Sequence, residues 1–321
     1  MFTVEVHATS HIGRVRKGNE DNFLVLDVSG QQAWTGSQDD SEFIIETQRF
    51  TVDDSGVVMA VSDGMGGALA GEVASTMAVE TVSSKLLDED TGENVEGADA
   101  DHHLISRLYE ATVFANHLIH EQGRTDPQYQ GMGATFTGIG VTPSAADVIQ
   151  VGDSRAYLLR NKTIYQVTKD QSLVQQLIDA QQISAEEAET HTLKNVILQA
   201  LGAQNEIYPV SARIAPCKDD VFLLCSDGLS NKVNAGEMQQ ILIDHFEDLK
   251  NAAAELVKLA NDNGGEDNIT VIIIKFEGDG LPDAADGAVN MELIDIGGIH
   301  DTADQAEDDE EDEADTAELE S

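Results

Sequence analysis

The sequence predicts an α+β fold in which mainly antiparallel sheets are flanked by helices. Three observations support this prediction. Short apolar or alternating runs typical of strands recur along the chain, two long amphipathic segments lie together between such runs, and the two kinds of element do not alternate strictly. A doubly wound parallel sheet would require strict alternation, so the grouping favours antiparallel sheets with helices packed on them.

The expected strands share an apolar or alternating pattern and are bounded by turn residues. They cover residues 3–9, 23–27, 57–61, 134–141, 148–151, 156–160, 163–168, 221–225 and 269–276. The expected helices share an apolar face at helical spacing. They cover residues 70–87, 104–122, 235–245 and 251–261.

Three further segments fall outside this core. Residues 29–55 are polar, contain Trp34, and are expected to form a long loop or a β-hairpin excursion. Residues 169–201 have a helical pattern and are expected to form an insertion between strand regions. Residues 278–321 end in QAEDDEEDEADTAELES and are expected to form an acidic, disordered tail, because like charges repel and few apolar residues are present. The expected domain therefore covers residues 1–277.

The composition restricts the possible partners. A chain of 321 residues with 41% hydrophobic content fits one domain or at most two. Its formal net charge of −42 disfavours nucleic acid and anionic membrane surfaces, and fits divalent cations or basic polypeptides better. Solubility, or adaptation to a salty habitat, is an equally acceptable explanation of much of that charge.

The cysteine content and the N-terminus indicate the compartment. The chain has two cysteines, Cys217 and Cys225, which is too few for a disulfide framework. Its start, MFTVEVHATSHIGRVRKGNEDNF, lacks the apolar region of a signal peptide, and no run of about 18 apolar residues follows anywhere. A cytoplasmic protein is therefore expected.

Aspartates recur in turns at the ends of expected strands. Each of these segments alone has an ordinary interpretation as a turn, but together they are harder to dismiss. The turns contain Ser62-Asp63-Gly64, Ser226-Asp227-Gly228, Glu266-Asp267-Asn268, Gly152-Asp153-Ser154 and Asn19-Glu20-Asp21.

Carboxylates of this kind indicate chemistry with hard divalent cations. Mg²⁺ and Mn²⁺ prefer oxygen ligands, and Mg²⁺ keeps several waters and needs few protein ligands. Two such ions about 4 Å apart can share a bridging water and stabilise an in-line displacement at phosphorus. Arg16, three residues before the Asn-Glu-Asp cluster, is the candidate to grip phosphoryl oxygens.

Other phosphate and metal chemistries fit less well. Neither cysteine is followed by an arginine-bearing phosphate loop, and the chain has no Gly-x-x-x-x-Gly-Lys-Ser/Thr motif. It also has no His-Glu-x-x-His zinc motif and no EF-hand loop.

The ordered set of motifs resembles the metal-dependent protein phosphatase (PPM) family, the type 2C serine/threonine phosphatases, in its compact bacterial form. The motifs, in family order, are GRVRKGNEDNF, AVSDGMGGALAGEVAS, MGATFTGIGV, VGDSRAYLLR, TKDQSLVQQL, LLCSDGLS and GGEDNITVIII. They run from about residue 2 to residue 276. The resemblance implies a four-layer α-β-β-α sandwich, two Mn²⁺ or Mg²⁺ ions, and a metal-bridging water as nucleophile without a covalent enzyme intermediate.

The resemblance also assigns roles to residues. Asp63 would bridge both metals, the carbonyl of Gly64 would bind the second, and Asp227 and Asp267 would hold the first. Asp153 would bind a third, weaker metal, with Asp227 as a candidate to share it. By the same resemblance Arg16 would bind substrate phosphate and Asp21 would support the metals through water. The insertion at residues 169–201 matches a mobile flap that shapes substrate choice.

Two departures from the family pattern affect these expectations. Many eukaryotic members have a histidine after the Asp-Gly, proposed as the general acid, and this chain has Met65 there. His191 lies in the flap-like segment, with an ordinary interpretation as a solvated surface residue. Residues 29–55 are longer than in compact relatives, and their role is open.

The resemblance implies phosphorylated protein substrates, a serine/threonine kinase whose action is opposed, and a monomer. Two alternatives remain: one belongs to another functional class, and the other keeps the phosphatase chemistry but restricts it to a regulatory role. A pseudophosphatase would keep the fold as a non-catalytic phosphoprotein-binding module, but it would have lost metal ligands that this chain keeps. A partner-switching regulator would usually carry a sensor domain before the phosphatase domain, and none fits ahead of Phe2.

Overall fold

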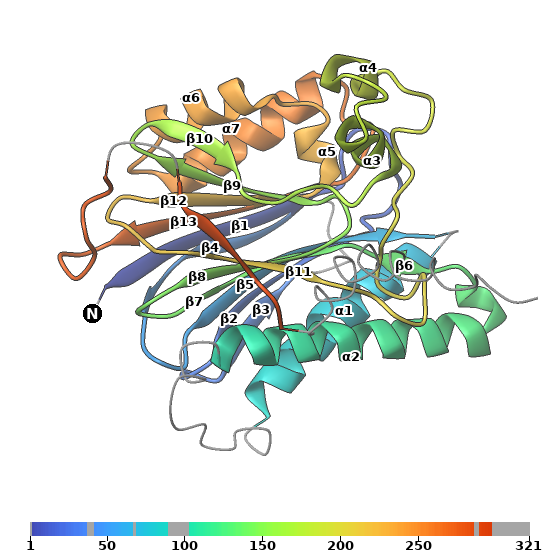
Figure 1. The fold of residues 1–321 in the computed structure, drawn as a ribbon, viewed down its shortest axis with the longest axis horizontal. Helices are drawn as coiled ribbons and strands as arrows, with labels where there is room; N and C mark the ends of the chain where they lie inside the picture. Colours follow the sequence, from blue (N-terminus) through green and yellow to red (C-terminus); the bar gives the residue numbers. More distant parts are fainter. Residues whose placement is uncertain (1, 37–41, 67–68, 89–102, 286–288, 297–321) are drawn as a thin grey trace, which may run out of the picture.

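The computed structural model describes residues 2–36, 42–66, 69–88, 103–285 and 289–296. Two antiparallel sheets lie face to face, and a pair of helices covers the outer face of each (Figure 1). The expected four-layer α-β-β-α sandwich is therefore confirmed. Among the described helices, none is both long and apolar enough to cross a membrane.

The first sheet has six strands in the order β10-β9-β12-β13-β1-β4. Their bounds are β10 Thr163–Gln166, β9 Arg155–Arg160, β12 Val221–Cys225, β13 Ile269–Glu277, β1 Thr3–His11 and β4 Glu42–Thr51. The second sheet has eight strands, in the order β14-β11-β8-β7-β5-β2-β3 with β6 paired to β5. Their bounds are β14 Met291–Ile294, β11 Val210–Ile214, β8 Ala146–Val151, β7 Phe136–Val141, β5 Val57–Met65, β2 Asp21–Asp27, β3 Gln32–Thr35 and β6 Gly133–Ala134.

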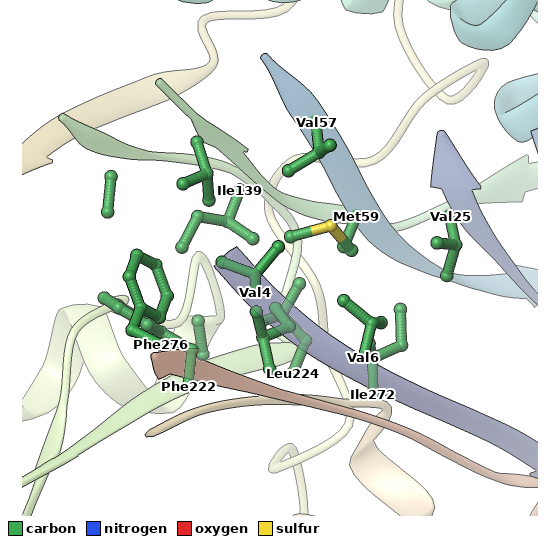
Figure 2. Packing of buried hydrophobic residues seen from close by; sticks show 14 of the residues in the cluster. Val4, Val6, Val25, Val57, Met59, Ile139, Phe222, Leu224, Ile272 and Phe276 are labelled. Carbon is green, nitrogen blue, oxygen red and sulfur yellow. The ribbon is translucent and has the colours of Figure 1, made fainter. Parts of the chain in front are cut away.

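The space between the sheets is filled by alternate residues of the central strands. Val4 and Val6 of β1 face Val57 and Met59 of β5 across this layer, with Phe276 of β13 beside them (Figure 2). All five are buried, and each buried side chain of this size contributes about 1.5–3 kcal/mol through removal from water. Strands that are buried on both faces have near-continuous apolar runs, which explains the mostly apolar sequence ITVIIIKFE of β13.

The helices close the two outer faces. Helices α1 (Ala70–Leu87) and α2 (His103–Thr125) cover the second sheet, and their apolar residues share one core with the outward residues of β2 and β5. Helices α6 (Ala235–Asp244) and α7 (Leu249–Asp262) cover the first sheet in the same way. The expected bounds of all four helices agree with these within a few residues.

Residues 29–55 connect the two sheets. Strand β3 pairs with β2 in the second sheet, whereas β4 pairs with β1 at the edge of the first sheet. The segment is therefore neither a loop nor a simple hairpin, because its two strands belong to different sheets. Phe43 and Trp34 pack against the inter-sheet core, which gives the polar segment apolar anchors.

The insertion at residues 169–201 is less helical than its pattern suggests. It contains two short helices, α3 (Leu173–Asp179) and α4 (Ala185–Glu189), each begun by a serine side chain that accepts a backbone hydrogen bond. A bridge between Ser172 and Ile197 closes the base of the insertion. The insertion projects at one end of the sandwich (upper right in Figure 1).

The ordered chain continues past the expected boundary at residue 277. Leu281 is buried in the inter-sheet core, and β14 pairs with β11 to form the edge of the second sheet. A disordered tail from residue 278 therefore does not describe the first part of this segment, because its few apolar residues have a core and a sheet edge to pack on. Residues 297–321 lie outside the described part of the chain.

Candidate active site

The candidate site residues lie at one end of the sandwich, where strands of both sheets end. Asp21 begins β2 and Asp63 lies near the end of β5, and the two residues are directly opposite each other in the antiparallel register. Asp227 begins the short helix α5 (Asp227–Ser230) two residues after the end of β12, and Asp267 precedes β13, the strand that pairs with β12. Sheet pairing therefore brings together carboxylates that are up to about 250 residues apart in the sequence.

Hydrogen bonds fix the backbone beside Asp63. Its N–H donates to the Thr135 hydroxyl at 2.9 Å, and its carbonyl accepts from the Thr135 N–H at 2.8 Å. The next residue, Gly64, touches the beginning of α1 so closely that an added Cβ would lie 2.1 Å from the carbonyl oxygen of Gly71. Only glycine allows this approach, which explains the Asp-Gly order at the end of β5. Gly67 of the same motif lies outside the described residues.

Asp153 lies in the turn between β8 and β9 and faces the same end. It shares with Asp227 a hollow of about 550 Å³ whose other wall is formed by α3 and α4 of the insertion. Arg155 ties the insertion to the sheet through a forked ion pair, with Nε at 2.9 Å and Nη2 at 2.7 Å from the two oxygens of Asp170. Arg155 lies within the motif VGDSRAYLLR, but no role for this arginine was predicted from the sequence.

Arg16 lies at the rim of the cluster formed by Asp21, Asp63, Asp153, Asp227 and Asp267, which is called the carboxylate group below. Its Nη2 donates to Asp267 Oδ2 at 2.7 Å and its Nη1 lies 3.3 Å from Glu20 Oε2. A second hollow, of about 480 Å³, opens beside it between Lys17 and Leu69. The arginine that sequence analysis placed at the phosphate is thus held between two carboxylates at the mouth of the site.

Burial and mutual repulsion raise the pKa values of four of the aspartates, Asp21, Asp63, Asp153 and Asp227. For Asp63 the loss of solvation is the largest cause, followed by repulsion from Asp21, Asp227, Asp153 and Asp267, and its pKa lies well above the usual range. Burial and then repulsion from Asp267 likewise raise the pKa of Asp227. The pKa values of Asp21 and Asp153 rise to about 7, in both cases chiefly through burial.

This donor set fits hard divalent cations. Within the described ranges, no three acidic, histidine or cysteine side chains lie close enough together to form a complete metal site by themselves. Mg²⁺ and similar ions need only one or two carboxylates each, with water completing the shell. The group consists of oxygen donors and contains more negative charge than Arg16 can balance, so divalent cations would remove the repulsion that raises the pKa values.

Met65 and His191 are the two residues that the sequence analysis connected with proton delivery. Met65 ends β5 opposite Gly133, and its thioether carries no exchangeable proton. His191 lies in the turn after α4, where its Nδ1 accepts the N–H of Leu193 at 3.1 Å. The contact is local to the turn and exposed.

The raised pKa values predict the pH dependence of the metal-free protein. Between about pH 4 and pH 7 the folded state holds protons on Asp21 and Asp153 that the unfolded chain releases. The free energy of unfolding in EDTA should therefore fall as pH rises through this window, by up to about 1.4 kcal/mol per pH unit for each group. Urea unfolding at pH 5 and pH 7.5 would measure the change.

The control for this prediction is Asp153→Asn, which cannot ionise and should flatten the slope. In the wild type, saturating Mn²⁺ should reverse the sign of this slope, because metal ligands must be deprotonated. A metal-free wild type that is more stable at pH 7.5 than at pH 5 would contradict the assignment.

Comparison with known proteins finds similarity to protein phosphatases at the level of a family model and of individual relatives. A family model described as Protein phosphatase 2C matches residues 36–262. The serine/threonine phosphatase stp of Listeria welshimeri is 34% identical over 267 residues, which cover 82% of this chain and 92% of that protein. Protein phosphatase PhpP of Streptococcus pneumoniae is 36% identical over 221 residues, which cover 68% of this chain and 85% of that protein.

Solved structures match the fold over most of the chain. The serine/threonine phosphatase PstP/Ppp of Mycobacterium tuberculosis has a TM-score of 0.68 at 31% identity, and covers 86% of this chain and 100% of its own. A structure of the catalytic domain of PstP in complex with two manganese ions has a TM-score of 0.66 at 30% identity, with coverage of 87% and 100%.

Proposed function

Because this chain belongs to the protein phosphatase 2C family and is a serine/threonine protein phosphatase, we propose that it hydrolyses phosphoserine and phosphothreonine at the carboxylate group described above. The observation that carries this proposal is the convergence of five aspartates and Arg16 on one end of the sandwich. In this proposal Asp63, Gly64, Asp227 and Asp267 hold two Mn²⁺ or Mg²⁺ ions, and Asp153 with Asp227 holds a third. Bound ions would supply an activated water and neutralise charge that develops on the phosphoryl group.

The protein residues then bind and orient the substrate. Arg16 presents N–H donors at the mouth of the site, where a forked guanidinium can bind two phosphoryl oxygens. Asp267 and Glu20 restrict the guanidinium before substrate arrives, so less conformational entropy is lost on binding. The insertion, with α3 and α4 beside Asp153, would contact the rest of the substrate protein.

Hydrolysis of a phosphothreonine peptide and of para-nitrophenyl phosphate, with Mn²⁺ and with EDTA, tests this proposal. Turnover that requires Mn²⁺ supports it. A folded protein that binds Mn²⁺ but hydrolyses neither substrate would overturn it and favour the non-catalytic phosphoprotein-binding alternative.

Arg16→Ala should lower kcat/KM for the phosphothreonine peptide by about 10–100-fold, since a charge-assisted hydrogen bond contributes about 1.5–3 kcal/mol. Arg16→Lys should recover only part of the loss, because an ammonium group cannot form the forked contact. Steady-state kinetics in saturating Mn²⁺ would measure both variants.

Arg14→Ala is the matched control for this prediction. Arg14 lies in the same loop, but its ion pair is with Asp262 at 2.6 Å, away from the carboxylate group. Its kcat/KM should stay near that of the wild type. Equal losses in the Arg14 and Arg16 variants would show that the loop, and not the Arg16 guanidinium, carries the effect.

The cellular setting belongs to the same proposal. Phosphorylated proteins would be the substrates, a serine/threonine kinase would act in opposition, and the enzyme would work as a cytoplasmic monomer. Both cysteines are buried free thiols, which suits a reducing compartment. The phosphatase domain would include the described residues up to 296, followed by the acidic segment.

A further inference from the structure

One oxygen of Asp21 is held by two hydroxyl groups from other parts of the chain. Asp21 Oδ2 accepts from Ser226 Oγ at 2.7 Å and from Thr270 Oγ1 at 2.7 Å. Ser226 lies between β12 and α5, and Thr270 is in β13, so both donors come from the first sheet or its continuation. All three side chains are buried, where a lost hydrogen bond cannot be replaced by bulk water.

The direction of these bonds follows from the number of protons. A hydroxyl has one proton, and Thr270 donates its own to Asp21. The Ser10 hydroxyl, 2.8 Å from Thr270 Oγ1, must therefore donate to Thr270. Ser10 Oγ in turn accepts from Asn19 Nδ2 at 2.8 Å. The chain of donors runs from Asn19 through Ser10 and Thr270 and ends on Asp21 Oδ2.

Two backbone bonds lock this chain in place. The N–H of Thr270 donates to Ser226 Oγ at 3.0 Å, which leaves the Ser226 proton for Asp21, and the N–H of Asp21 donates to Asn19 Oδ1 at 3.2 Å. Ser10 and Thr270 are also direct cross-strand partners of β1 and β13. The network therefore joins the first sheet to β2 of the second sheet beside the candidate metal site.

We propose that Ser226, Thr270 and Ser10 are positioning residues that orient the Asp21 carboxylate for divalent-cation binding. This inference rests on the proposed function, because it takes the carboxylate group as the metal site. Two donors on Oδ2 restrict rotation of the carboxylate plane and leave Oδ1 as the oxygen that can accept from a metal-bound water. Every donor faces an acceptor, so the network is fully satisfied only when Asp21 Oδ2 accepts.

Thr270→Val keeps the shape of the side chain and removes the donor. Loss of such an outer hydrogen bond to a metal site typically weakens metal affinity by about 10–100-fold, and this is the increase expected in the Kd for Mn²⁺ measured by titration calorimetry. Thr270→Ser keeps the hydroxyl and should restore a Kd close to that of the wild type. Ser226→Ala should weaken Mn²⁺ binding in the same direction.

Thr112→Val is the matched control. Thr112 is also fully buried and hydrogen-bonded, but to the carbonyl of Leu108 within α2. Its Kd for Mn²⁺ should equal that of the wild type. Thermal unfolding in EDTA separates stability from metal binding, because a merely structural hydroxyl would lower the melting temperature without changing the Kd at 25 °C.

The results distinguish the positioning role from the metal site itself. Wild-type Kd values in folded Thr270→Val and Ser226→Ala would overturn the positioning role while leaving the proposed function intact. Absence of Mn²⁺ binding by the wild type would overturn the metal site, and this inference with it. If Thr270→Val fails to fold, Ser10→Ala carries the test. It removes the hydroxyl that donates to Thr270 and accepts from Asn19, leaves both donors on Asp21 in place, and should weaken Mn²⁺ binding in the same direction.

Discussion

Asp63→Asn should abolish Mn²⁺-dependent turnover and, in the same protein, raise the melting temperature in EDTA. Asparagine keeps the size of the side chain and removes the charge that two cations would share. Loss of several kcal/mol of metal-derived stabilisation corresponds to a fall in kcat/KM of at least about 10³-fold. The hydrogen bonds of the Asp63 backbone with the Thr135 hydroxyl and N–H do not depend on the carboxylate, so the variant should fold.

The gain in metal-free stability has an electrostatic cause. Burial, and then repulsion from four neighbouring aspartates, raises the pKa of Asp63, so its ionised form destabilises the folded state without metal. Removing the charge removes that repulsion. Phosphothreonine-peptide kinetics in Mn²⁺ and thermal unfolding in EDTA measure the two effects. Turnover within tenfold of the wild type, or a lower melting temperature, would contradict the role given to Asp63.

Asp147→Asn provides a matched control with the opposite result. Asp147 is also a buried aspartate, but it accepts from Arg213 Nε at 2.7 Å and from Nη2 at 2.8 Å, away from the carboxylate group. Weakening a buried ion pair is typically destabilising by about 3–5 kcal/mol when one charge is left without its partner. This variant should therefore lose stability and keep its kcat.

The central part of the fold could be predicted from the sequence because its strands and helices have strong local patterns. The run at residues 221–225 is apolar throughout and the run at residues 269–276 is mostly apolar, and the structure shows that both of their faces are covered. The weakly patterned elements were missed. Strand β11 was not predicted, and β14 lies in a segment that was expected to be disordered. Each is only four or five residues long and has exposed positions, so neither carries a strong local pattern.

The carboxylate group could also be anticipated, since the same turn motif recurs at the strand ends. Which strand ends meet is a property of the sheet order, and no local pattern encodes it. Ser226 and Thr270 stand within the quoted motifs, but sequence gives no reason to choose them over neighbouring hydroxyl residues. Their hydrogen bonds to Asp21 depend on the tertiary arrangement that brings the ends of β12 and β13 close to the start of β2.

Gly228→Ala is the second substitution that we expect to have a large effect, because two backbone segments lie very close together beside the site. Gly228 follows Asp227 and Asn268 follows Asp267, and a Cβ on residue 228 would lie 1.9 Å from the carbonyl oxygen of Asn268. Gly228→Ala must therefore push α5 away from the start of β13, and Asp227 away from Asp267. A displacement of about 1 Å in a catalytic site can lower the rate by about 10²-fold, and overpacking of this kind destabilises by about 1–3 kcal/mol.

Gly18→Ala is the control for Gly228→Ala, because a Cβ at Gly18 meets no atom within 4 Å. Its kcat/KM and its melting temperature should stay near those of the wild type, whereas Gly228→Ala should lose about 10²-fold in kcat/KM. Raising the Mn²⁺ concentration should recover part of that loss, since a misplaced pair of carboxylates still attracts cations. Wild-type kinetics in Gly228→Ala would show that the spacing of Asp227 and Asp267 tolerates displacement. The absence of a side chain at residue 228 would then serve packing alone.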